Sequence, residues 1–140
     1  MSRKSSRALL IVLSLVFALA IATPALAHNK GCTPGFWKNH TEAWVGYTPD
    51  QTIGSVFSAT PAPYDSMTLL EGLSLQGGPD FAGKLEILLR AAIAGLLNRD
   101  YPATKFANRV NAKIMTGDPD IVVAFAAKLD KQNNGDCTAD

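Results

Sequence analysis

The only two cysteines of the 140-residue chain, Cys32 and Cys137, lie near the two ends of the region that follows an apolar leader. If they pair, they close a loop of about 100 residues, and the chain-entropy model assigns such a cross-link about 4–5 kcal/mol. The alternatives are two independent thiols or a metal site, and neither cysteine has the C-x-x-C partner typical of structural zinc. A disulfide would require the two ends of the folded chain to meet.

The first 27 residues have the pattern of a secretory signal peptide. A start with three positive charges precedes an apolar run over residues 8–22, and an A-x-A cleavage site ends at Ala27. The apolar run is shorter than the about 20 residues that a membrane-spanning helix needs. We therefore expect a single secreted domain over residues 28–140, extracellular or periplasmic, with no retained membrane anchor.

Loss of the leader changes the charge of the chain. The leader contains three of the 13 Lys and Arg residues and none of the 12 Asp and Glu residues, which leaves a net charge of about −2. Without a run of like charge, this balance gives no reason to expect nucleic acid or an anionic membrane as a partner. No complete phosphate-loop, calcium-loop or nucleophile motif is present, so no cofactor is expected. The expected partner is an extracellular ligand, glycan or protein.

Apolar residues recur at spacings of three and four, which predicts an all-α fold of about five to six helices. The widest apolar stripe, which includes Phe81, predicts a long helix from about Pro79 to Asn98. Further helices are predicted after Tyr101-Pro102, as far as Gly117, and from the cap Asp118-Pro119-Asp120 to Asn133, the last with Ile121 on its apolar face. The predicted domain is small, with orthogonally packed helices clasped by one terminal disulfide.

Three shorter helices are predicted before the long one. Thr33-Pro34 has the signature of an N-cap and a first helical residue, and that helix should present Trp37, His40 and Trp44 on one face. Thr48-Pro49-Asp50-Gln51 predicts the start of a second short helix, and Asp65-Ser66 the start of a third.

The run Cys32–His40 (Cys-Thr-Pro-Gly-Phe-Trp-Lys-Asn-His) has two interpretations. In the first, the two tryptophans anchor the core, and the polar residues after Trp37 form hydrogen bonds, with Asn133 or Asn134 as candidate partners. In the second, aromatic faces beside polar side chains form a shallow site for a sugar or a peptide. The candidate ligand-binding residues are Trp37, Lys38, Asn39, His40 and Trp44.

This run, together with Asn133-Asn134 shortly before Cys137, resembles a secreted bacterial domain family. The family opens with Cys-Thr-Pro-Gly-(Phe/Tyr)-Trp-Lys-Asn-His and closes with Asn-Asn before a second cysteine. The segments 73–78, 96–98 and 101–102 extend the resemblance over nearly the whole domain, although the glycine run at Gly77-Gly78 is shorter than is usual in the family. The resemblance implies export and this architecture, but no function, because the family has no settled biochemical activity.

We expect a non-enzymatic extracellular or envelope module with a structural or ligand-binding role. The alternative class is a small secreted hydrolase that uses His40, which would need a second ionisable group within hydrogen-bonding reach. A further alternative is Cu(II) binding by the amine and imidazole of His28, the N-terminus after cleavage, with His40 as a third nitrogen ligand.

Overall fold

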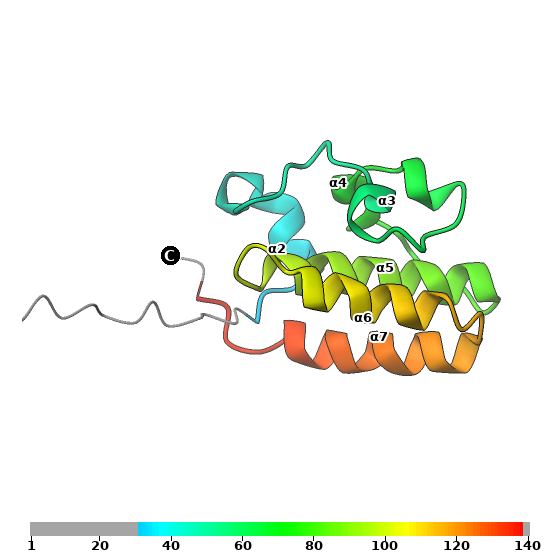
Figure 1. The fold of residues 1–140 in the computed structure, drawn as a ribbon. Coiled ribbons are helices and arrows are strands. Elements are labelled where there is room, and N and C mark those ends of the chain that lie inside the picture. The colour runs from blue at the N-terminus through cyan, green and yellow to red at the C-terminus, as the bar shows by residue number, and fades with distance from the viewer. Residues whose placement is uncertain (1–30, 139–140) are drawn as a thin grey trace, which may run out of the picture.

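The structure is a computed structural model in which residues 31–138 are described; the predicted leader and His28 lie outside these residues. The described residues form six α-helices and two short 3-10 helices and contain no β-strand, which confirms the predicted all-α fold (Figure 1). In chain order the elements are α2 (Pro34–Asn39), η1 (Thr41–Ala43), α3 (Ile53–Val56), η2 (Tyr64–Ser66), α4 (Leu69–Gly72), α5 (Phe81–Leu97), α6 (Thr104–Ile114) and α7 (Pro119–Asn133).

Helix α5 is the centre of the fold. It contacts α2 and α4 as well as α6 and α7, and in Figure 1 the short helices lie on one side of it and α7 on the other. Its start follows from sequence, because the Asp80 carboxylate accepts a hydrogen bond from the Gly83 amide at 2.8 Å. All residues from Ala91 to Asn98 are buried, because this half of the helix is covered on every side.

The two helices after α5 confirm the predicted boundaries. Helix α6 begins two residues after Pro102 and ends three residues before Gly117, which has a positive φ of 63°. Helix α7 begins at Pro119, and the Asp118 carboxylate accepts hydrogen bonds from the amides of Asp120 and Ile121 at 2.9 and 3.3 Å. It ends at Asn133, as the Asn-Asn-Gly segment predicts.

The prediction that Phe81 and Ile121 belong to the buried apolar faces of their helices is wrong. Phe81 is 38% exposed and Ile121 is 39% exposed. Both lie in the first turn of their helices, α5 and α7, and a 3.4 Å ion pair between Lys84 and Asp120 joins these two turns. The apolar stripe of each helix therefore begins one turn before its partner helices cover it.

The starts of the short helices also differ from the prediction. Helix α3 begins after Thr52, and α4 begins after Thr68, whose hydroxyl forms a capping box with Glu71. The Ile53 amide donates to the Met67 carbonyl at 2.8 Å, so the two helix starts are paired with each other through the backbone. This pairing is a tertiary contact, which outcompetes the local start signals at 48–51 and 65–66.

The disulfide between Cys32 and Cys137 confirms the predicted clasp. It joins residues 105 positions apart, with their Cα atoms at 4.6 Å, and brings the chain end after α7 to the segment before α2. Such a bond fits an oxidising compartment. Within residues 31–138, no helix is both long enough and apolar enough to cross a membrane.

Candidate functional site

The opening run folds into α2 through local interactions. The Thr33 hydroxyl accepts a hydrogen bond from the Phe36 amide at 3.2 Å, and Pro34 occupies the first helical position, where no amide is needed. At the other end, the Asn39 side chain donates to the Gly35 carbonyl at 2.8 Å. The helix is one and a half turns long, which leaves its orientation to be set by tertiary contacts.

A buried amide, Asn98, holds α2 in place. Its Oδ1 accepts from the Cys32 amide at 2.9 Å and from Trp37 Nε1 at 3.0 Å. Its Nδ2 donates to the Cys32 carbonyl and to Asn133 Oδ1, both at 2.9 Å. Asn98 thus uses two donors and two acceptor sites, which is the whole capacity of an asparagine amide. This single side chain joins the end of α5 to the start of the domain and to the end of α7.

Asn133 extends this network to the C-terminal side. Its Nδ2 donates to the Ala91 carbonyl at 2.9 Å, and its side chain is buried at the end of α7. Next to it, the Gly31 amide donates to the Asp136 carbonyl at 3.0 Å. A Cβ at Gly31 would lie 2.6 Å from the Gly135 backbone, so this approach of the two chain ends requires glycine. We call Cys32, Trp37, Asn98 and Asn133 the amide network.

The burial of Trp37 agrees with the interpretation in which it anchors the core, but the predicted bonds from the polar residues after it to Asn133 or Asn134 are wrong. Trp37 is 1% exposed, and Asn133 reaches the run through Asn98. In the described residues Lys38, Asn39 and His40 are exposed and form no hydrogen bond to Asn133 or Asn134. The side chain of Asn134 donates to the Asp130 carbonyl instead.

The helical spacing predicts His40 on one face with the two tryptophans, and this prediction is wrong. Helix α2 ends at Asn39, and His40 has φ −130° and ψ 57°, so its ring leaves the helix face and is 47% exposed. It stacks on Phe36 with ring centroids at 4.3 Å, and its Nδ1 lies 3.1 Å from Glu42 Oε1. The pKa of Glu42 is lowered, first by its own backbone amide and then by its hydrogen bond to His40.

The five candidate ligand-binding residues are separated by the fold. Trp37 is buried in the amide network, and half-buried Trp44 donates its indole N–H to the Trp37 carbonyl at 3.0 Å, closing the end of α2. The Asn39 side chain donates a hydrogen bond to the Gly35 carbonyl of its own helix, and His40 faces solvent beside Glu42. Trp37 lines a hollow beside Val45 and Tyr101, and Lys38 borders a different, more apolar one.

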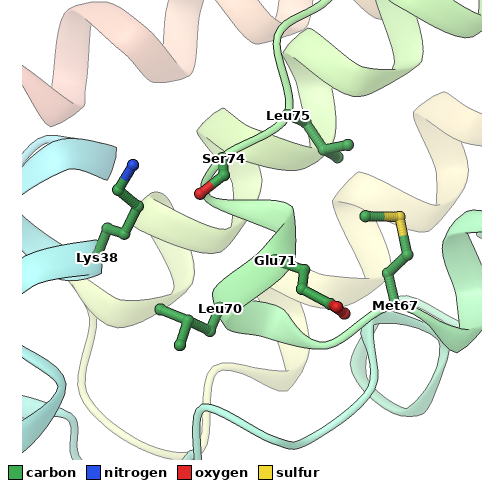
Figure 2. A pocket seen from close by; sticks show the side chains of 6 residues that line it. All are labelled: Lys38, Met67, Leu70, Glu71, Ser74 and Leu75. Atoms are coloured by element: carbon green, nitrogen blue, oxygen red, sulfur yellow. The ribbon is translucent and has the colours of Figure 1, made fainter.

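That hollow, of about 520 Å³, lies between α2 and α4 and is called here the α2–α4 groove. Figure 2 shows Lys38 on one side, Met67 and Leu75 on the other, and Leu70, Glu71 and Ser74 between them. The Glu71 carboxylate is committed to the capping box, and its pKa is lowered by hydrogen bonds from the Thr68 amide and hydroxyl. Lys38 has no carboxylate within 4.0 Å in the described part of the chain.

Sequence reasoning missed Asn98 as the central residue of this region. The signal was present, because Asn98 is a polar residue at the end of the longest apolar stripe and belongs to a segment shared with the resembling family. The apolar pattern predicts only the end of a helix at this position, and Asn98 is the C-cap of α5. An asparagine has this second role only if buried partners surround it, and those partners come from distant parts of the chain.

Residues 31–138 contain no group of three or more His, Cys, Asp or Glu side chains that could hold a metal ion. The proposed copper ligand His28 lies outside the described residues. Comparison of the chain with protein-family models, with curated proteins and with solved structures finds no match in any of the three.

Trp37→Ala is expected to lower the free energy of unfolding by about 3–5 kcal/mol, because it opens a cavity in the core and leaves one acceptor site of Asn98 empty. His40→Ala should stay within about 0.5 kcal/mol of the parent, like other exposed positions. Urea denaturation followed by far-UV circular dichroism measures both. A His40→Ala cost of several kcal/mol, or a Trp37→Ala variant as stable as the parent, would contradict the assignment.

Proposed function

We propose that the protein is a secreted, non-enzymatic binding module that recognises a protein segment in the α2–α4 groove. In this proposal the opening run has two sides. Its buried side, Cys32 and Trp37, clasps the two ends of the domain, and its exposed side presents Lys38 to the ligand. The bound segment has an aliphatic or aromatic side chain for the groove and an acidic side chain next to it for Lys38.

The position of Lys38 beside the groove is the observation that carries this proposal. Met67, Leu70 and Leu75 give the groove an apolar surface that is only partly buried. Lys38 is the cation at its edge and lacks a carboxylate partner within the described residues, whereas Glu71 is already bonded to Thr68. An apolar surface with one available positive charge selects an apolar segment with a neighbouring negative charge.

The hydrolase alternative has less support. In the described residues, Glu42 is the one ionisable side chain within hydrogen-bonding distance of His40, and both side chains are largely exposed. A general base acting on a nucleophile needs that nucleophile within about 2.6–3.2 Å, directly or through one water. No hydroxyl or thiol of residues 31–138 hydrogen-bonds to the His40 ring, which favours a binding role.

The proposal predicts a defined peptide preference. A positional-scanning library of capped heptapeptides, screened against the exported protein, should select Leu, Met or Phe within two residues of Asp or Glu. Leu70→Asp should weaken the selected peptide at least about tenfold, since it places a charge on the apolar surface. Lys38→Glu should reverse the charge preference, so that Lys or Arg replaces the acidic residue.

Lys131→Glu provides the matched control, because Lys131 is an exposed lysine on α7 away from the groove. It makes the same charge change and should leave selection unchanged. All variants are first checked for parental circular dichroism. The proposal fails if no sequence is selected, if Lys38→Glu and Lys131→Glu behave alike, or if the peptides are cleaved by the parent and not by His40→Ala.

A further inference from the structure

A second groove, separate from the one beside Lys38, lies between the segment 47–58 and the start of α6. It has a volume of about 310 Å³, within the range of about 300–1,000 Å³ typical of small-molecule sites. Its polar lining consists of hydroxyl and amide side chains, and it contains no Lys, Arg, His, Asp or Glu residue. Its aromatic and amide lining includes Tyr47, Gln51, Tyr101, Asn108 and Asn111, and Thr104 adds a hydroxyl. We call this the tyrosine groove.

Tyr101 presents an aromatic face that is exposed yet held in position. It is 56% exposed, and its ring meets the ring of Tyr47 edge to face with centroids at 5.2 Å. Gly46, with φ 78°, lies directly against it, and a Cβ there would come within 2.2 Å of the Tyr101 ring. Tyr47 is itself fixed, since its hydroxyl accepts a hydrogen bond from the Ala103 amide at 3.3 Å. An exposed aromatic ring on a fixed support is a preorganised stacking surface.

The hydrogen-bonding groups beside this ring divide into two kinds. Asn111 is structural, because its Oδ1 accepts from the Ala59 amide at 3.1 Å and its Nδ2 donates to the Ser58 hydroxyl at 3.3 Å. The side chains of Gln51, Thr104 and Asn108 make no hydrogen bond within the described residues. Three groups that can each donate and accept therefore line the groove next to the Tyr101 ring.

We propose that the tyrosine groove binds a neutral saccharide. The apolar C–H face of a sugar ring can stack on an aromatic ring, here Tyr101, while its hydroxyls both donate and accept hydrogen bonds, as Gln51, Thr104 and Asn108 do. The uncharged lining does not compensate the charge of a uronic acid, a phosphate or an amino sugar, which would lose hydration on entering. This site goes beyond the proposed protein ligand and places a saccharide at a groove separate from Lys38.

The test uses the exported protein labelled with ¹⁵N and neutral hexasaccharides built from glucose, mannose, galactose or N-acetylglucosamine. At least one of them should shift the backbone amide signals of residues around Tyr101, Thr104 and Asn108 in a saturable titration. A uronic-acid hexasaccharide should produce no saturable shift at these positions. Capped uncharged heptapeptides serve as the competing ligand class in the same titration.

Three variants locate the site. Tyr101→Ala should weaken saccharide binding at least about tenfold, whereas Tyr101→Phe, which keeps the ring, should stay within about twofold. Asn108→Ala, at an exposed position, should weaken it about fivefold, the loss expected for one hydrogen bond. Lys38→Glu should leave it unchanged, so failure here is distinguishable from failure of the proposed protein site. The proposal is overturned if no hexasaccharide shifts these signals, if only the peptides or the uronic acid do, or if Tyr101→Ala and Asn108→Ala bind like the parent.

Discussion

Asn98→Leu is expected to lower the free energy of unfolding by about 4 kcal/mol or more, although leucine has the same branched arrangement of side-chain heavy atoms as asparagine. The change leaves four buried groups without their partner: the amide and carbonyl of Cys32, the Trp37 indole N–H and Asn133 Oδ1. An unsatisfied buried polar group costs about 1–3 kcal/mol. Because a domain of this size is stable by only about 5–15 kcal/mol, the effect should be visible as a large fall in the urea midpoint.

A double-mutant cycle separates the amide network from a general effect of the substitution. Asn98→Leu and Asn133→Leu remove the same 2.9 Å hydrogen bond, so the double variant should cost clearly less than the sum of the two single variants. Asn108→Leu provides the control at an exposed asparagine on α6 and should change stability by no more than about 0.5 kcal/mol. Additive costs, or an Asn98→Leu variant close to the parent, would show that Asn98 is not the centre of the network.

Loss of the disulfide is the second large effect. The bond closes a loop of 105 residues, for which the chain-entropy relation gives about 4–5 kcal/mol. The Cys32→Ala/Cys137→Ala variant is therefore expected to unfold at a much lower urea concentration, while its circular dichroism at low temperature keeps the parental helical shape. Using both substitutions avoids leaving a free thiol. A coincident urea midpoint for the variant and the parent would contradict this expectation.

Mass spectrometry of the exported parent protein checks whether the leader has been removed and whether the disulfide has formed. We expect a mass corresponding to residues 28–140 less two hydrogens, unchanged by alkylation of the unreduced protein. A retained leader would contradict the proposed export, and added alkyl groups would contradict the bond. The disulfide and the amide network should also couple, because both hold Cys32. Asn98→Leu should therefore cost less in the cysteine-free variant than in the parent.

The three long helices were predictable because their signals are local. The Asp80 and Asp118 caps, the glycine after α6 and the asparagines after α7 act within a few residues, and each boundary lies where they place it. The clasp was predictable because a chain with two cysteines has one possible pairing within itself. The short elements were not, because α3 and α4 are too short to be set by periodicity, and the Ile53–Met67 backbone pairing sets their starts.

The arrangement around the opening run depends on tertiary contacts for the same reason. The sequence by itself determined that the chain is helical and that its two ends meet, and it left Trp37 as either a core anchor or part of a ligand site. It could not determine that Trp37 and Asn133 both form hydrogen bonds to Asn98, because they lie 61 and 35 positions from it in the chain. It also misplaced His40, since a helix of one and a half turns carries too little periodic information to show that α2 ends at Asn39. Helix caps and periodicity are local and can be predicted from neighbouring residues, whereas a buried amide and the lining of a groove depend on which distant segments the packed core brings together.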